Sequence, residues 1–211
     1  MDFNSFLTHI SRLKEAPLGG LESQFKMAPA LRMKFNAERI EQQNPRESAV
    51  LALFYPDREN ITHFLLTLRA SYKGTHSSQI SFPGGKKEQL DQNLVSTALR
   101  EAQEEVGVLT SEVSIYRALT KTYIPPSNFW VAPFMGVTHE KPSFSTNDEV
   151  ERLIEVKLSD LLDDRYLVTK NLTTSYMKNV EVPCFLLNDQ IVWGATAMIL
   201  SEIKDLLNSP Y

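Results

Sequence analysis

The stretch from Asn93 to Val106 constrains the fold more than any other part of the sequence. Its apolar side chains recur at intervals of four, three and four residues, which places them along one face of an α-helix. These residues are Val95, Leu99, Ala102 and Val106. Gly107 follows at a position where helices commonly end. Because one face of this helix must pack against other structure, the segment predicts a layered domain.

Runs of strand-forming residues lie on both sides of this helix. Before it, the runs from Ser48 to Tyr55 and from Thr62 to Leu68 are separated by Pro-Asp-Arg-Glu-Asn, which predicts a β-hairpin. After it, strands are predicted at 113–120, 129–137, 150–156, 166–176 and 180–187. A short helical turn is expected at 158–162 and a closing helix at 194–207. Strands with helices between and after them indicate an α/β protein with a mixed sheet covered by helices.

The first 45 residues are expected to form an N-terminal helix and arm, packed on a domain that spans residues 46–211. Apolar residues recur at helical spacing near the start, at Phe3, Phe6, Leu7 and Ile10. The sequence Pro-Leu-Gly-Gly at 17–20 interrupts this pattern, and a mixed basic and apolar stretch follows through Met33. The sequence therefore predicts one helix followed by an irregular arm.

Composition and charge exclude several classes of protein. Asp and Glu number 26 against 22 Lys and Arg, so no general positive field attracts a nucleic acid, and no such partner is expected. The longest apolar stretch, residues 191–200, is shorter than the roughly 18 residues that a membrane span needs. The early acidic residue Asp2 is unlike a secretory signal, and a single cysteine, Cys184, agrees with a reducing compartment. We therefore expect a cytoplasmic protein with one sizeable core and no membrane partner.

Three carboxylates lie beside the apolar face of the predicted helix, at Glu101, Glu104 and Glu105. They fall within about one third of the helix circumference. Like charges at this spacing repel by a few tenths of a kcal/mol per pair, so the arrangement gains nothing unless a positive group sits there. A divalent cation such as Mg²⁺ or Mn²⁺ prefers carboxylate oxygens and is one such group. A solvated acidic face is the alternative that the helix alone leaves open.

A glycine pair precedes this helix, in Ser81-Phe82-Pro83-Gly84-Gly85. The stretch from Gly85 through Asp91 to Val108 resembles the Nudix box, which reads Gly, five residues, Glu, seven residues, Arg-Glu-apolar-any-Glu-Glu-any-Gly-apolar. Residues 100–108 match the second half of this pattern at every specified position. The first half departs from it twice, because Asp91 replaces the first Glu and eight residues separate Asp91 from Arg100.

The resemblance implies the Nudix fold, an α/β/α sandwich around a mixed sheet. It also implies hydrolysis of a pyrophosphate linkage in a nucleoside diphosphate derivative, with Mg²⁺ or Mn²⁺ as the cofactor. Glu101 and Glu105 are the first choices as metal ligands, with Glu104 beside them. Arg100 is implied to orient or neutralise the carboxylates when metal is absent. For the general base, similarity to the family favours Glu149, with Glu101 as the alternative.

A second resemblance is to the coenzyme A pyrophosphatases of this family. Leu65-Leu66-Thr67, Arg69 and Phe82-Pro83-Gly84-Gly85 are similar to the signature that precedes the Nudix box in that group, and the spacing is preserved. The implied substrate-binding residues are Arg69, Lys73, Gly84 and Gly85. The implied reaction cleaves coenzyme A or its thioesters to 3′,5′-ADP and a 4′-phosphopantetheine product. Three signature positions have changed, to Ala70, Gly74 and Ser78.

Those changes keep other functions open. One alternative is a Nudix hydrolase for ADP-ribose, NADH or a nucleoside triphosphate. Another is a Nudix-fold binding module without catalysis, although all three carboxylates of the box are present. In each case the partner is a small nucleotide, and a homodimer is the assembly kept open. Residues 123–126 and 128–130 are candidates for adenine contact or for the core, and Trp193 is expected to pack beneath the closing helix.

Overall fold

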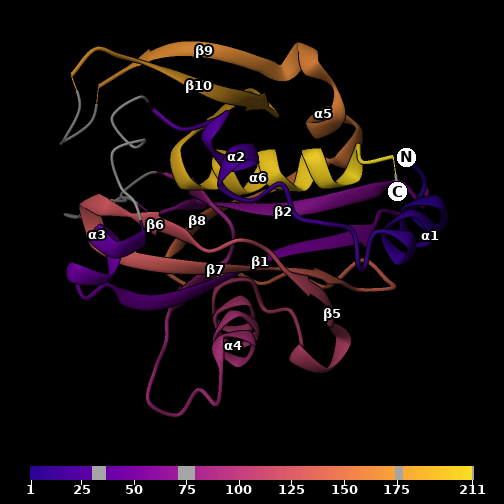
Figure 1. Cartoon of the computed structure of the whole chain (residues 1–211). Coiled ribbons are helices and arrows are strands. Elements are labelled where there is room, and N and C mark those ends of the chain that lie inside the picture. Colours follow the sequence, from indigo (N-terminus) through magenta and orange to yellow (C-terminus); the bar gives the residue numbers. More distant parts are fainter. Residues whose placement is uncertain (30–36, 71–78, 174–177, 211) are drawn as a thin grey trace.

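The computed structural model describes residues 1–29, 37–70, 79–173 and 178–210. Two β-sheets and the helices around them make up this part of the chain (Figure 1). The helices are α1 (Phe3–Arg12), α2 (Gly20–Phe25), α3 (Ala37–Gln42), α4 (Leu94–Val106), α5 (Leu158–Leu162) and α6 (Gly194–Leu207). The short 3-10 turns are η2 (Thr110–Glu112), η3 (Pro125–Ser127) and η4 (Asp164–Tyr166).

The larger sheet has eight strands and is mixed, as the sequence predicted. Its strands are β1 (Arg46–Pro56), β2 (Thr62–Arg69), β3 (Ile80–Ser81), β4 (Gly84–Lys86), β5 (Ser114–Ala118), β6 (Thr122–Ile124), β7 (Phe129–Val137) and β8 (Val150–Lys157). Strand β1 lies at its centre and pairs antiparallel with β2 and β4, and parallel with β7. The predicted hairpin is therefore confirmed. On the outer sides, β2 pairs antiparallel with β8, and β7 with β5.

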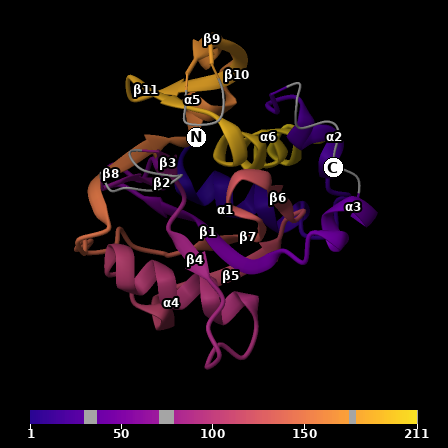
Figure 2. The same cartoon turned by 90° about the vertical axis from the view of Figure 1, so that its left-hand side faces the viewer.

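Side chains of β1 alternate between two hydrophobic cores, one on each face of the sheet. Leu51 and Leu53 pack with Ala102 of α4, whereas Ala52 and Phe54 belong to the core beneath α1 and α6. This period of two is what a strand covered on both faces requires. Figures 1 and 2 show α4 on one side of the sheet and α6 on the other. The α/β/α sandwich predicted from the family resemblance is thus confirmed.

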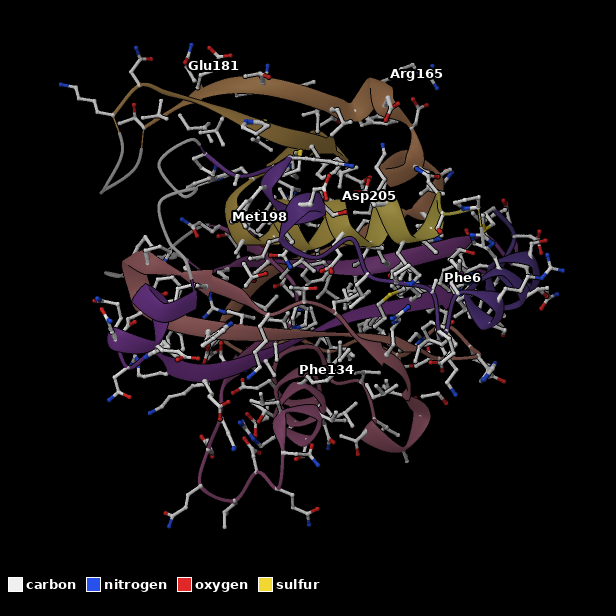
Figure 3. All side chains as sticks on the ribbon, viewed as in Figure 1. Phe6, Phe134, Arg165, Glu181, Met198 and Asp205 are labelled. Carbon is white, nitrogen blue, oxygen red and sulfur yellow. The ribbon has the colours of Figure 1, made fainter. Side chains whose placement is uncertain are left out.

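Helix α6 lies between the large sheet and a second, three-stranded antiparallel sheet (Figure 1). The strands of this small sheet are β9 (Leu167–Leu172), β10 (Val180–Leu187) and β11 (Gln190–Val192). In Figure 3, Met198 of α6 points into the interior, whereas Arg165 of η4 and Glu181 of β10 project outward. Cys184 is a buried residue of β10. No helix in the described part of the chain is long and apolar enough to cross a membrane.

The N-terminal arm is more regular than the sequence predicted. Helix α1 is confirmed, its start capped by the Asp2 side chain, with Phe6 fully buried against Phe54. The prediction of an irregular arm after it is wrong, because α2 and α3 are helical. Gln24 of α2 is buried and donates a hydrogen bond to the buried carboxylate of Glu202 on α6. Such a short helix is stabilised by its tertiary contacts, so periodicity within the arm could not reveal it.

Candidate active site

The glycine pair Gly84-Gly85 lies in β4, where the backbone packs closely against β1 on one side and α4 on the other. Gly84 has a φ of 154°, and a side chain there would overlap the backbone of Ala49. A side chain on Gly85 would overlap the carboxylate of Glu101. Glycine is therefore required at Gly84, where only a bare backbone allows β4 to lie against β1, and Gly85 leaves room for Glu101 to approach β4 closely.

Helix α4 is fixed at both ends, which sets the direction of its carboxylates. Asn93 and Ser96 form a reciprocal capping box at the start. Gly107 ends the helix in the left-handed conformation, with a φ of 74°. The face that carries Glu101 and Glu105 is thereby turned towards a cavity bordered by β4.

Glu105 is the most enclosed acid of the cavity, with only 3% of its side chain exposed. The backbone N–H of Gly84 donates a hydrogen bond to its Oε2 at 3.0 Å, and Arg69 Nη1 lies 3.3 Å from its Oε1. Burial raises the pKa of Glu105 to about 7, and the charges of Glu101 and Glu149 act in the same direction. A bound cation would therefore stabilise the charged form of Glu105 strongly, because burial disfavours that form.

Glu101 lies one helical turn before Glu105, and its side chain is 17% exposed. Burial raises its pKa, although the neighbouring Arg100 guanidinium, 3.1 Å away, opposes that shift. Both carboxylates line the same cavity. Holding both carboxylates in their charged form on one wall therefore costs free energy, because each is partly buried.

Arg100 is held by Asp91, the residue that departs from the Nudix pattern. Its Nε and Nη2 each donate to the Asp91 carboxylate at 3.0 Å, and it also contacts Glu104 and the carbonyl oxygen of Lys86. These bonds hold the pKa of Asp91 well below its usual range. Asp91 is therefore a firm anchor for Arg100 despite the extra residue between them.

Glu149 reaches the cavity from the loop before β8. The Asn147 N–H donates to the Glu105 carbonyl oxygen at 3.3 Å, and the Glu149 N–H donates to the Asn147 side chain at 3.0 Å. Ala70 N–H donates to the Glu149 carbonyl oxygen at 2.8 Å. The backbone is thus tied to both α4 and β2, while the Glu149 side chain remains 63% exposed. Its carboxylate lies 3.2 Å from Arg69 Nη2.

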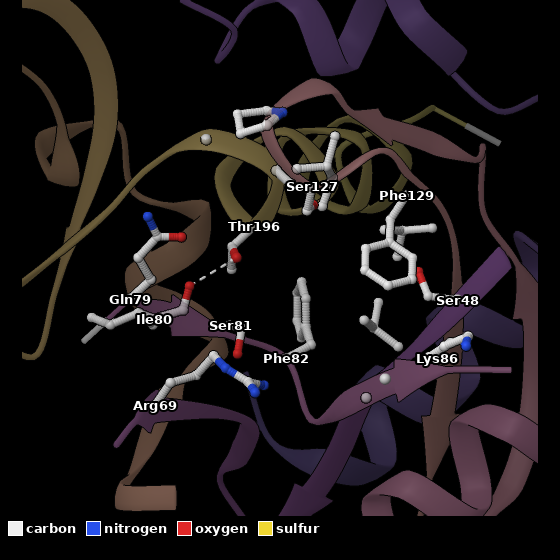
Figure 4. A pocket seen from close by; sticks show the side chains of 18 of the residues that line it. Ser48, Arg69, Gln79, Ile80, Ser81, Phe82, Lys86, Ser127, Phe129 and Thr196 are labelled. Atoms are coloured by element: carbon white, nitrogen blue, oxygen red, sulfur yellow. Dashed lines mark hydrogen bonds between the residues drawn. The ribbon is translucent and has the colours of Figure 1, made fainter. Parts of the chain in front are cut away.

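The cavity measures about 550 Å³ and has two unlike walls (Figure 4). The predicted site residues on its charged wall are Arg69, Gly84, Gly85, Glu101, Glu105 and Glu149. The opposite wall is mostly apolar and comes from η3, from Phe129 and Val131 of β7, and from residues 193–196 at the start of α6. In Figure 4, Arg69 and Phe129 approach the cavity from opposite sides.

Other predicted residues lie elsewhere. Arg100 and Glu104 are not among the residues that line the cavity, and the Glu104 side chain is 55% exposed and paired with Arg100. Its role as a metal ligand stays a prediction. Lys73 lies outside the described residues. Trp193 lines the cavity at the start of α6, a position that sequence reasoning assigned to packing. Helical spacing could not reveal this, because Trp193 and the carboxylates of α4 come to line one cavity only in the folded chain.

The sequence profile of the NUDIX domain matches residues 45–173, more than half of the chain. The chain belongs to the Nudix hydrolase family. The uncharacterized Nudix hydrolase NudL of Yersinia pestis (strain Pestoides F) is 34% identical over 141 residues, covering 66% of this chain and 69% of that protein. NudL of Yersinia pseudotuberculosis serotype O:1b (strain IP 31758) gives the same values. A MutT/nudix family protein from Enterococcus faecalis shares the fold, with a TM-score of 0.51 and 16% identity over 90% of this chain and 74% of that one.

Nudix hydrolases generally use divalent metal ions, and the donor set of this chain fits one. Within the described residues, no three His, Cys, Asp or Glu side chains form a ready-made metal group. Mg²⁺, however, commonly takes one or two carboxylates and completes its shell with water and substrate phosphates. Glu101 and Glu105 supply two such carboxylates on a cavity wall, where burial makes their negative charge costly. We therefore expect Glu101 and Glu105 to hold the metal.

Proposed function

We propose that the chain is a Mg²⁺- or Mn²⁺-dependent hydrolase that cleaves the diphosphate bond of coenzyme A or its thioesters. The products are 3′,5′-ADP and a 4′-phosphopantetheine compound. One observation carries the proposal: a single cavity joins the carboxylates of the Nudix helix to Arg69 and Gly84-Gly85, the residues that resemble the coenzyme A signature. Membership of the Nudix family supports the coarser statement, hydrolysis of a nucleoside diphosphate derivative.

The reaction needs a water molecule to attack phosphorus, a P–O bond of the anhydride to break, and a base to accept a proton. When bound, a divalent cation neutralises the phosphate oxygens and lowers the pKa of a coordinated water. Glu149 is the proposed base because its largely exposed carboxylate borders the cavity on a loop anchored to Glu105. Glu101 is the alternative, since it lines the same wall.

Positioning falls to the residues around these acids. Gly84 and Gly85 bring the β4 backbone close to the carboxylates and leave room for a diphosphate beside them. Arg69 is proposed to bind a phosphate, because a guanidinium can donate two parallel hydrogen bonds to phosphate oxygens. Arg100 is proposed to orient Glu101 from outside the cavity, as their 3.1 Å contact allows.

The apolar wall suits the parts of coenzyme A outside the diphosphate, its adenine and pantetheine portions. Phe129 presents a ring to the cavity (Figure 4). Residues 124–126 also line the cavity and supply further apolar surface. A cavity with apolar walls and few polar groups is typical of sites for ligands of this size. We expect this wall to contact the adenine or the pantetheine portion.

A comparison of substrates tests the proposal. Coenzyme A, dephospho-coenzyme A, ADP-ribose and NADH should be assayed with Mg²⁺ and with Mn²⁺, and the products separated by chromatography. We expect the highest kcat/KM with coenzyme A or its thioesters and the appearance of 3′,5′-ADP. A clear preference for ADP-ribose or NADH would instead support the second candidate, a Nudix hydrolase for another nucleoside diphosphate derivative, which the altered signature positions Gly74 and Ser78 keep open.

A further inference from the structure

Arg69 forms ion pairs with two acids, Glu105, the proposed metal ligand, and Glu149, the proposed general base. Its Nη1 lies 3.3 Å from Glu105 and its Nη2 lies 3.2 Å from Glu149. The Arg69 side chain is 20% exposed, so this bridge is partly screened from solvent. Figure 4 shows the guanidinium inside the cavity, beside Ser81 and Phe82.

The bridge lies on the wall where a metal is expected. Glu105 is the enclosed carboxylate of the proposed metal pair, and Arg69 already places a positive charge against its Oε1. Arg100, the other guanidinium nearby, instead contacts Glu101 and Glu104. A divalent cation on Glu105 would face Arg69 at a few ångströms in a partly desolvated cavity, where like charges repel strongly.

We infer that Arg69 is a counter-ion that competes with the metal: it holds Glu105 and Glu149 together in the metal-free protein and leaves Glu105 when a divalent cation binds. The inference rests on the proposed metal-dependent function. It adds to that function a control on metal affinity, set by a residue that is not a ligand.

A second consequence concerns Glu149. While Arg69 bridges the two acids, the Glu149 carboxylate is engaged in an ion pair and tied to the metal wall. Departure of Arg69 from Glu105 frees the guanidinium to meet substrate phosphate and loosens its hold on Glu149. Metal binding, phosphate binding and release of the proposed base are thereby coupled through one positioning residue.

The experiment measures Mn²⁺ binding without substrate, by electron paramagnetic resonance or calorimetry, at fixed pH and salt. Arg69→Gln removes the competing charge and should tighten Mn²⁺ binding about tenfold, equivalent to about 1.4 kcal/mol. Lys86→Gln is the matched control. Lys86 also lines the cavity, lies well apart from Arg69 in Figure 4 and is exposed to solvent, so its loss should change the affinity by less than about twofold.

Arg69→Lys provides a second variant that keeps the charge but lacks the two-pronged guanidinium. It should bind Mn²⁺ with an affinity between those of the wild type and Arg69→Gln. Circular dichroism checks the fold, and if Arg69→Gln does not fold, Arg69→Lys decides: an affinity no tighter than that of the wild type overturns the inference. In a folded Arg69→Gln protein, unchanged or weaker Mn²⁺ binding overturns it as well.

Failure of the proposed function gives a different pattern. Tighter Mn²⁺ binding by Arg69→Gln, together with no cleavage of coenzyme A by the wild type, would support the counter-ion role and reject the substrate. A wild-type protein that binds no Mn²⁺ would reject the metal-dependent function and the counter-ion role together. Equal tightening in Arg69→Gln and Lys86→Gln would show a general effect of cavity charge and overturn the specific role of Arg69.

Discussion

The two walls of the cavity are built from the sequence in different ways. The charged wall is dominated by two neighbouring stretches, the turn at 80–86 and helix α4, with Arg69 and Glu149 added by the pairing of β2 and β8. The apolar wall collects residues 124–127, Phe129, Val131 and residues 193–196, which are distant in the chain and come together only in the fold. Chemistry is therefore concentrated in a local motif, whereas the surface for the rest of the substrate depends on tertiary structure.

This difference suggests separate duties for the two walls. Groups on the charged wall lie beside the proposed diphosphate, so their loss should lower turnover. Groups on the apolar wall contact parts of the substrate that do not react, and they should affect mainly KM. Substitutions on each wall test whether the two walls have these separate duties.

Glu105→Gln should have the largest effect. It removes a proposed metal ligand, and kcat/KM should fall by more than about a hundredfold, since even groups that only support ligands typically account for 10- to 100-fold. The backbone N–H of Gly84 can still donate to the Gln side-chain oxygen, so the turn at β4 is retained. Steady-state kinetics over a range of Mg²⁺ concentrations provide the measurement. Wild-type activity in this variant would remove Glu105 from the metal site.

A control on the fold of Glu105→Gln uses metal-free thermal unfolding at several pH values. Burial raises the pKa of Glu105 to about 7 from an ordinary value of 4.5. Between these values the folded protein binds a proton that the unfolded chain releases, so this group's contribution to stability declines as pH rises from 4.5 to 7. Gln cannot titrate, and the variant should lose less stability than the wild type across that range. An equal loss in both proteins would argue against the raised pKa.

Glu149→Gln is expected to have the next largest effect. Loss of a general base should lower kcat by about 10²-fold or more while Mn²⁺ affinity changes little. Asp148→Asn is a matched control, because Asp148 is an exposed neighbour that does not line the cavity. Weaker metal binding at an unchanged kcat would make Glu149 a ligand instead. No change in either quantity would return the base role to Glu101.

Arg69→Ala should lower kcat/KM by about ten- to a hundredfold, the amount expected when a charge-assisted contact to phosphate is lost. Because Arg69 lies beside Glu105, we expect it to meet the diphosphate, and the loss should be similar for coenzyme A and dephospho-coenzyme A. Comparing the two compounds in wild type and variant provides the measurement. A loss confined to coenzyme A would assign Arg69 to the 3′-phosphate.

The sequence predicted the helices and strands that are long enough to show a regular pattern of apolar residues. Strand β7 and helices α5 and α6 begin and end where alternation, helical spacing and turn residues indicated. Strand β9 begins at Leu167, because η4 takes in Tyr166, and it ends at Leu172; residues 174–176 of the predicted strand lie outside the described residues. The short strands β3, β4, β6 and β11 carry too few residues for any period to be visible, and pairing with longer neighbours defines them.

For the site, the spacing of Glu101 and Glu105 on one helix predicted their common wall, because helix geometry is local. The same geometry did not separate Glu104 from them. In the structure Arg100 pairs with both Asp91 and Glu104, and neither Arg100 nor Glu104 lines the cavity. The contact between Arg69 and Glu105 could not be predicted either, because it joins the end of β2 to α4, two elements that the fold brings together.

Phe129→Leu should have the smallest effect and tests the apolar wall directly. Leu keeps the wall apolar but removes the aromatic face, and stacking of a base on such a face is worth about 1–3 kcal/mol. If adenine lies on this ring, KM should rise at least about fivefold while kcat stays near the wild-type value. The Phe129 ring also lies 4.1 Å from the Arg46 guanidinium, so a small loss of thermal stability should accompany the change. Phe144→Leu is the matched control, because Phe144 packs against Tyr55 on the α4 side of the sheet and is absent from the cavity lining. A fall in kcat with an unchanged KM would place Phe129 close to the reacting groups, and the division of duties between the walls would then be wrong.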